Sequence, residues 1–397
     1  MVPPTRLAKT LASALGGIIP AVAIKVLQVI NILATGGAEL MVKRLALGFD
    51  RTRVECDIVA ICEAPADADK IFRSGTSEQG IRTLSLDKQP GRKDLAALWR
   101  LARLIRSGRY DLVHMHCPSP SVYGRIASLF APGTSRVVTI HNLMNANEVR
   151  FEKFLAPLTD CFIACSPESH ANLLNDCQFS EDKVRCIFNG TGSDRTLRVS
   201  KAREDIRRDR GVAPGEQVGI VLARLEQQKA HLDLLEALVQ PGERIGKLKL
   251  WLVGNDRTPY GDEVRRSIAE KGLEARVEIL GRVADNEVDE LMKGADLFLL
   301  PSHREGMSVA ILEALAAALP TVISDLETNR EVTQGGRFAW LTPIRDPVGL
   351  AAALNELLSA PDEMKQRAQD GALYVQERFS FDRVVEEYSE VYEELRG

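Results

Sequence analysis

Two glutamates, Glu305 and Glu313, are the residues of this chain whose type and spacing most directly imply chemistry. They lie eight positions apart, which is roughly 12 Å along a helix, so their carboxylates cannot share a proton or a metal ion. Two separated hydrogen-bond acceptors suit a long polyhydroxy ligand that has hydroxyl groups at each end. The alternative is that Glu305 caps a helix and Glu313 lies on its solvated face, and this spacing alone does not decide between the two.

The residues between the glutamates favour an anion. Gly306, Met307 and Ser308 fall where a helical pattern begins, and the first amides of a helix are unpaired and point toward the positive end of its dipole. Hydroxyl-binding carboxylates at two ends with a phosphate site between them describe a nucleotide sugar as the ligand.

The surrounding elements position these residues at the end of a strand. Residues 297–300 form a short apolar run typical of a buried parallel strand, and Pro301 and Ser302 end it. A helical pattern follows from near Met307, and residues 321–324 read as the next strand after a break at Pro320. Such a strand–loop–helix–strand unit places a ligand at the carboxyl end of its strands.

The same alternation of strands and helices runs through most of the chain. A polar, charged segment at 191–210 divides it into two halves and reads as a linker, because few apolar residues interrupt it. We therefore expect an α/β protein with two parallel-sheet domains. The further strands that we expect are at 24–30, 54–62, near Leu84, and at 111–115, 136–140, 160–165, 184–188, 218–223, 248–254 and 276–281.

Two segments carry a resemblance to a known family. PSHREGMSVAILEALAAALPTVISD, from Pro301, resembles the E-x7-E donor-site signature of the retaining GT-B glycosyltransferases. ARLEQQKAHLDLLEAL, from Ala223, resembles that family's G-R-L-x-x-x-K-G segment, whose Arg and Lys hold the donor diphosphate and correspond here to Arg224 and Lys229. The resemblance assigns Glu305 to the catalytic set and Glu313, Gly306, Met307, Ser308 and Val309 to donor binding.

Three further segments resemble other parts of the family pattern. GGAE, with Gly36 and Gly37, resembles its first loop, which meets the donor phosphate and the acceptor, although an ordinary tight turn needs the same glycines. VTIHN resembles its T-x-H segment, whose His (His141 here) reaches the donor sugar and phosphate, although a lone His at a strand end is mostly structural. The family also places base contacts at the positions of Arg282 and Val283.

The resemblance implies the GT-B fold, with two Rossmann-like doubly wound domains facing across a cleft. We expect an N-terminal extension at 1–23, an acceptor domain at 24–195, a donor domain at 210–375, and a helix at 376–397 that crosses back to the first domain. Ala223, Ala230 and Ala318 stand where the family has glycines, so we expect a tighter or repacked pocket there.

Composition indicates a protein of a reducing compartment that does not bind nucleic acid. The formal net charge of −4 gives no overall basic footprint, and the seven cysteines form no CxxC pair, so we expect reduced thiols and a cytoplasmic protein. The first 23 residues superficially resemble a secretory signal, but Gly16, Gly17 and Pro20 interrupt the apolar run, and we favour a loosely ordered extension.

A basic amphipathic helix at 92–109 allows two interpretations. It either contacts anionic lipid or packs an apolar stripe on the sheet, and we favour packing, with peripheral membrane contact left open. The basic residues in it are Arg92, Lys93, Arg100, Arg103, Arg106 and Arg109.

These observations together predict a retaining glycosyltransferase that moves a sugar from a UDP- or GDP-hexose donor to a saccharide or lipid-linked acceptor, in polysaccharide or glycoconjugate assembly. The sequence holds no aspartate-rich metal motif, so we expect no metal and no cofactor, the nucleotide sugar being a substrate. A sugar-nucleotide epimerase and a catalytically silent nucleotide-sugar-binding protein remain alternatives. A dinucleotide oxidoreductase is disfavoured because the first loop lacks G-x-G-x-x-G.

Overall fold

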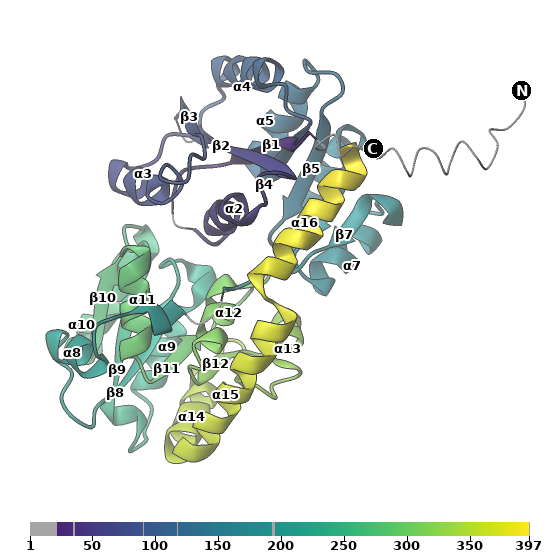
Figure 1. Cartoon of the computed structure of the whole chain (residues 1–397). Helices are drawn as coiled ribbons and strands as arrows, with labels where there is room; N and C mark the ends of the chain where they lie inside the picture. Colours follow the sequence, from purple (N-terminus) through teal and green to yellow (C-terminus); the bar gives the residue numbers. More distant parts are fainter. Residues whose placement is uncertain (1–21, 35, 90, 117, 193–194, 397) are drawn as a thin grey trace, which may run out of the picture.

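The structure is a computed structural model that describes residues 22–34, 36–89, 91–116, 118–192 and 195–396. Two α/β domains, each built on a parallel sheet, lie one above the other in Figure 1. The expected extension at 1–23 falls almost wholly outside the described residues. Within the described part, no helix is long and apolar enough to cross a membrane.

The first domain is a sheet of order β3-β2-β1-β4-β5-β6-β7, in which all neighbours run parallel. Its central strands are mostly buried because helices cover both faces of the sheet, whereas the edge strands β3 and β7 are partly exposed. The strands are β1 (Ile24–Ile30), β2 (Val54–Cys62), β3 (Thr83–Lys88), β4 (Leu112–His116), β5 (Ser135–Ile140), β6 (Cys161–Ala164) and β7 (Val184–Cys186). The helices are α2 (Gly37–Gly48), α3 (Ala66–Arg73), α4 (Leu95–Gly108), α5 (Pro118–Ser128), α6 (Ala146–Leu155) and α7 (Pro167–Asn175).

The second domain repeats the architecture with a sheet of order β10-β9-β8-β11-β12-β13. Its strands are β8 (Gln217–Leu222), β9 (Leu248–Val253), β10 (Val277–Gly281), β11 (Leu297–Leu300), β12 (Thr321–Ser324) and β13 (Trp340–Thr342). The helices are α8 (Arg203–Asp209), α9 (His231–Leu238), α10 (Pro259–Glu270), α11 (Asp285–Gly294), α12 (Val309–Ala316), α13 (Glu327–Thr333), α14 (Pro347–Ser359) and α15 (Pro361–Arg378). The expected two-sheet α/β fold is confirmed.

The last helix, α16 (Phe381–Arg396), leaves the second domain and packs on the first (Figure 1). At the crossing, the Thr191 amide donates to the Phe379 carbonyl and the Phe381 amide donates to the Thr191 carbonyl, both at 2.9 Å. Tyr388 and Tyr392 then enter the apolar core of the first domain, which buries both rings. The first and the last element of the described chain, β1 and α16, therefore both belong to the first domain.

The alanines that replace family glycines differ in backbone conformation. Ala230 and Ala318 lie in the left-handed region, with φ of +53° and +50°, whereas Ala223 has no positive φ. The Ala223 carbonyl instead approaches Gly254, where a Cβ would lie only 2.0 Å from that oxygen. The constraint at 230 and 318 is therefore backbone strain, more than the crowding that the sequence led us to expect.

We expect Ala230→Gly and Ala318→Gly each to raise the free energy of unfolding. Relieving the left-handed conformation gains about 1–2 kcal/mol, and the added freedom of glycine costs about 0.5–1 kcal/mol. The net gain should be about 0.5–1 kcal/mol per site, measured by urea denaturation. Ala223→Gly is the matched control and should destabilise, because no strain is relieved there; equal effects at all three sites would contradict this account.

Candidate active site

Each of the two sheets has a switch point, where its strand order reverses. The strand order reverses between β8 and β11 in the second sheet and between β1 and β4 in the first. In open parallel sheets a ligand binds beyond the carboxyl ends of such neighbouring strands, because the two crossovers lead to opposite faces and leave a crevice. The loop after β8 carries Arg224 and Lys229, and the loop after β11 carries Glu305.

Lys229 and Glu305 form the centre of the site. The Lys229 ammonium lies 2.7 and 2.8 Å from the two carboxylate oxygens of Glu305, and the Ser302 hydroxyl donates to Oε1 at 2.6 Å. Glu305 is only 5% exposed. A buried carboxylate is tolerated because a cation and a hydroxyl satisfy it, so the pair is held in one geometry before any ligand arrives.

The two loops that hold this pair are tied to each other. Gln228 donates from its side chain to the Arg304 carbonyl at 2.8 Å, and its own carbonyl accepts from the His303 amide at 2.8 Å. The His303 ring contacts the Asp233 carboxylate at 2.7 Å. The loops after β8 and β11 therefore behave as one platform.

His141 brings the first domain to this platform. It follows β5, and its carbonyl oxygen would lie 1.9 Å from a Cβ built on Gly306, so only glycine allows this approach. One further contact crosses the interface: the Asn189 side chain donates to the Met307 carbonyl at 2.7 Å. Within the first domain, the Cys165 thiol donates to the same His141 carbonyl at 3.4 Å. Glu305 therefore sits directly beside the junction of the domains.

The start of α12 is less open than the sequence led us to expect. Ser308 is its N-cap and makes no side-chain capping bond, while Met307 and Val309 are buried. Burial raises the pKa of the Cys165 thiol to about 12, and the Met307 amide points at this sulfur and partly offsets the shift. The Met307 amide therefore faces the thiol, and the expectation of free amides at Gly306, Met307 and Ser308 stays a prediction.

Arg224 stands at the edge of the site with a more exposed side chain. It pairs with Glu226 at 2.7 Å. Across the cleft, burial raises the pKa of Glu39, and Arg224 and Arg282 offset part of that rise, which places all three charges close together. Glu39 belongs to the first turn of α2, which begins at Gly36 (N-cap) and Gly37. Val283 follows Arg282 in the half-buried link to α11.

Glu313 is buried and paired with two arginines that the sequence did not single out. Its Oε1 accepts from Arg44 of α2 and, at 3.0 Å, from Arg195, which lies between the domains. Arg195 also pairs with Asp289 of α11 at 2.9 Å. Burial would raise the pKa of Glu313, but the two guanidinium groups outweigh it, and the carboxyl pKa lies below its usual value. Glu313 is therefore no solvated helical residue.

Comparison with known proteins identifies the family of this chain. Residues 35–195 match glycosyltransferase family 4 and residues 202–373 match glycosyl transferases group 1. The chain belongs to the GT-B glycosyltransferases. EpsD of Bacillus subtilis (strain 168), named as a glycosyltransferase, is 28% identical over 79% of this chain and 83% of its own length.

Two more comparisons extend this result. The UDP-Gal:α-D-GlcNAc-diphosphoundecaprenol α-1,3-galactosyltransferase of Escherichia coli is 25% identical over 68% of this chain and 71% of its own length. Anabaena HepE, solved in complex with UDP and glucose, superposes with a TM-score of 0.80 at 23% identity, covering 94% of this chain and 100% of that one. The second likeness supports the fold.

In this glycosyltransferase, the predicted catalytic residues and Glu313 lie in different surroundings. Glu305, Lys229, Gly306 and His141 meet at the domain junction, whereas Glu313 lies among arginines against α11. No cluster of three or more His, Cys, Asp or Glu side chains able to hold a metal ion occurs among the residues described. Arg44 and Arg195 were missed because pairing across 269 and 118 positions leaves no local signal.

Removing Glu313 from this glycosyltransferase should leave a buried guanidinium without its partner. We expect Glu313→Ala to lower the free energy of unfolding by about 3–5 kcal/mol, because Arg44 keeps its charge in a buried place. Arg195 retains Asp289. The double variant Arg44→Met/Glu313→Leu should recover most of the loss in chemical denaturation.

An exposed ion pair supplies the control for that prediction. Glu363 and Arg367 pair at 2.7 Å on the surface of α15, and Glu363→Ala should cost less than about 1 kcal/mol. A Glu313→Ala variant as stable as Glu363→Ala would show that Arg44 finds solvent or another partner.

Proposed function

We propose that this glycosyltransferase moves a hexose from a UDP- or GDP-sugar to a saccharide or lipid-linked saccharide acceptor, with retention of configuration. The observation that carries the proposal is the Lys229–Glu305 pair held at the switch point of the second sheet, against the His141 carbonyl of the first domain. Lys229, which would bind the diphosphate, and Glu305, which would bind the sugar, thus lie side by side at the junction of the two domains.

The chemistry that we propose depends on charge stabilisation. Lys229, with Arg224 and Arg282 nearby, would balance the negative charge that develops on the departing diphosphate, and preorganised cations in a site closed to water are effective at this. We propose that this makes a metal ion unnecessary. Attack from the side of the leaving group, without a protein nucleophile, would retain configuration at the sugar carbon.

The relatives support the choice of donor and acceptor class. One of them is named for a UDP-galactose donor and a diphosphoundecaprenol-linked acceptor, and a structural neighbour was solved with UDP and glucose. We propose the same classes for this chain, and a role in polysaccharide or glycoconjugate assembly in the cytoplasm.

A thermal-shift screen of the full chain against UDP, GDP, ADP and their sugars tests the donor. A ligand at a hundred times its Kd should stabilise the folded state by about 2.7 kcal/mol. Incubation of the selected nucleotide sugar with saccharide acceptors, followed by NMR of the product anomer, then tests transfer and retention. Release of an altered sugar without an acceptor would favour an epimerase, and binding without turnover a silent binding protein.

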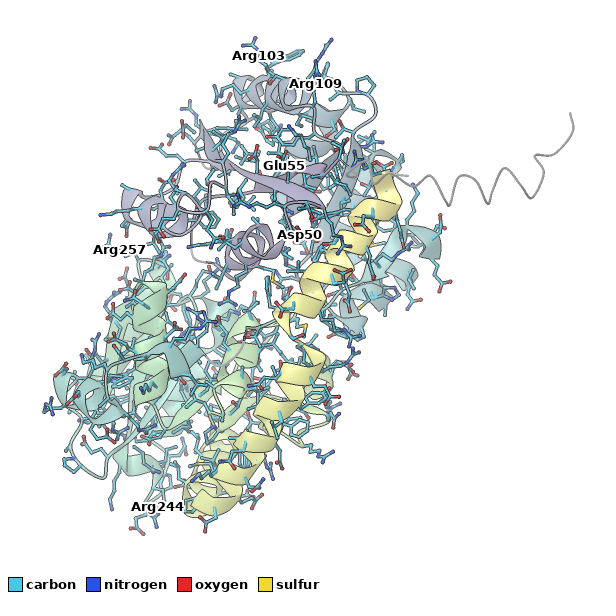
Figure 2. All side chains as sticks on the ribbon, viewed as in Figure 1. Asp50, Glu55, Arg103, Arg109, Arg244 and Arg257 are labelled. Atoms are coloured by element: carbon cyan, nitrogen blue, oxygen red, sulfur yellow. The ribbon has the colours of Figure 1, made fainter. Side chains whose placement is uncertain are left out.

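We further propose that α4 brings the enzyme to an anionic membrane surface. Leu95 and Trp99 are 73% and 59% exposed, and the Trp99 ring lies 4.9 Å from that of Phe130 on the segment after α5. Figure 2 shows Arg103 and Arg109 extending from α4 away from the body of the molecule. Exposed apolar rings beside cations are the composition that an anionic lipid surface binds.

Vesicle sedimentation separates this role from simple packing of the helix. We expect binding to vesicles that contain phosphatidylglycerol but not to pure phosphatidylcholine, and its loss in Arg103→Glu/Arg109→Glu. Arg244, an exposed arginine at the opposite end of the molecule in Figure 2, is the control, and Arg244→Glu should bind as before. Equal binding by both variants would contradict the proposal.

A further inference from the structure

A continuous chain of hydrogen bonds connects His141 to the C-terminal helix. His141 Nε2 lies 3.0 Å from His116 Nδ1, and His116 Nε2 lies 2.7 Å from Gln28 Oε1. The Gln28 side-chain amide then donates to the Tyr392 hydroxyl at 2.9 Å. His116, Gln28 and Tyr392 are fully buried, and His141 is half-buried at the domain junction.

The direction of these hydrogen bonds fixes the position of each proton. Gln28 Oε1 can only accept, so His116 carries its proton on Nε2. Burial, in the company of His114 and His141, lowers the pKa of His116 far below 6.5, so this ring holds one proton and its Nδ1 is an acceptor. The proton between the two imidazoles must therefore come from His141 Nε2.

His141 is consequently left with an unprotonated Nδ1. Burial lowers the pKa of this ring to about 4, so it too is neutral near pH 7. Its other nitrogen is already engaged with His116, and Nδ1 has no hydrogen-bond partner in the part of the chain that the structure describes. His141 thus offers the site an acceptor and no donor.

The orientation of the Gln28 amide depends on Tyr392. The tyrosine hydroxyl has one proton, and it lies 2.7 Å from His114 Nδ1, so it donates there and accepts from Gln28. His114 Nε2 in turn donates to the Thr139 hydroxyl at 2.7 Å. If the amide turned over, every bond in the chain would reverse, and His141 would present an N–H at Nδ1 instead.

We propose that Tyr392 of α16, acting through Gln28 and His116, is a positioning residue that holds His141 with its proton on Nε2, so that Nδ1 accepts a hydrogen bond from a hydroxyl of the donor sugar. The sugar part of this statement rests on the proposed function, while the tautomer does not. An acceptor cannot bond a phosphate oxygen, which also only accepts. Lys229 and Arg224 therefore bind the diphosphate, and His141 binds the sugar.

The tautomer can be measured without any substrate. Long-range ¹H–¹⁵N correlation spectra of the full chain, labelled with ¹⁵N-histidine and assigned with His141→Gln, report which nitrogen of each ring is protonated. We expect His141 to carry its proton on Nε2 at pH 7.5 in the wild type. A proton on Nδ1, or a doubly protonated ring, would overturn the proposal.

Two tyrosines one helical turn apart give a matched pair of variants. Tyr392→Phe removes the hydroxyl that orients Gln28, and Tyr388→Phe removes an equally buried hydroxyl whose contact with Thr139 is 3.5 Å long. We expect the His141 tautomer to shift in Tyr392→Phe and to stay in Tyr388→Phe. Gln28→Leu, which removes the acceptor beside His116, should produce the same shift and keeps the test available if Tyr392→Phe fails to fold.

Kinetic and binding measurements then distinguish a contact with the sugar from a contact with the diphosphate. Tyr392→Phe should lower kcat about tenfold, as expected for loss of one hydrogen bond, and leave the Kd for the free nucleoside diphosphate within twofold of wild type. An unchanged tautomer and kcat in Tyr392→Phe would refute the positioning role. If the wild type has the expected tautomer but no nucleotide sugar is bound or turned over, the proposed function fails while the hydrogen-bond assignment stands.

Discussion

Lys229→Ala should lower the kcat for glycosyl transfer by about two to three orders of magnitude, the effect typical of removing one preorganised group that stabilises developing charge. The ammonium is 2.7 Å from Glu305 and lies in the loop after β8, where the departing diphosphate would gain charge. Little water can replace it, because Glu305 and Ser302 beside it are buried. Steady-state kinetics with the selected donor measure the loss.

Two control variants separate charge from packing. Lys229→Arg keeps the cation and should recover much of the rate, although its planar group cannot reproduce the same contact with Glu305. Lys271→Ala removes a surface lysine that pairs with Glu236, and it should leave kcat unchanged. Circular dichroism and the melting temperature confirm that each variant is folded.

Arg224→Ala tests the second cation. Its side chain is more exposed and pairs with Glu226, so we expect it to turn toward the diphosphate as the ligand binds. We expect a large loss of turnover here as well, with the fold intact. Near-normal rates in both Lys229→Ala and Arg224→Ala would contradict the assignment of this site.

The buried strands were the part of the fold that the sequence predicted best. The bounds of β1, β2, β11 and β12 are as expected, because parallel strands covered on both faces are mostly apolar and stand out from the polar segments around them. The segment expected to be a linker contains α8, which was missed because Ile206 is its only buried side chain. A short charged helix held by ion pairs to Asp296 has no apolar periodicity to reveal it.

The sequence named the residues of the candidate site, but it did not indicate which of them pair with each other. Motif spacing pointed to Lys229 and Glu305, yet nothing in one sequence shows that they bond each other across 76 positions. The same limit hid Arg44 beside Glu313. The connection from His141 through His116 to Tyr392 also has no local signal in the sequence, because α16 brings Tyr392 to the far end of this chain of hydrogen bonds only in the folded protein.

The stability of this protein should fall steeply in mild acid, because three buried histidines and the half-buried His141 are held in neutral form. Burial lowers the pKa of His114 and His116 far below 6.5, and that of His141 and His231 to about 4. In the unfolded chain each histidine titrates near pH 6.5. Below that pH the unfolded state binds more protons than the folded state, so acid favours unfolding.

We expect the free energy of unfolding to change little between pH 8 and 7 and to fall by about 4–5 kcal/mol between pH 6 and 5. Each neutral buried histidine contributes about 1.4 kcal/mol per pH unit while the unfolded ring is protonated and the folded ring is not. Below pH 4 the histidine contribution to the slope should fall toward half, because His141 and His231 take up protons in the folded state while His114 and His116 stay neutral. Urea denaturation in steps of half a pH unit measures the curve.

His231→Leu tests the origin of that slope. Neither ring nitrogen of His231 has a hydrogen-bond partner among the residues that the structure describes, so leucine can fill the same buried space without losing a hydrogen bond. We expect the variant to be at least as stable as wild type at pH 7 and to lose about a quarter of the acid sensitivity, since one of four equal contributions is gone. Two outcomes would contradict this account: a pH dependence of the unfolding free energy in His231→Leu that is parallel to wild type, or a wild-type curve that is flat to pH 5. Either would mean that these imidazoles take up protons as readily in the folded chain as in the unfolded one.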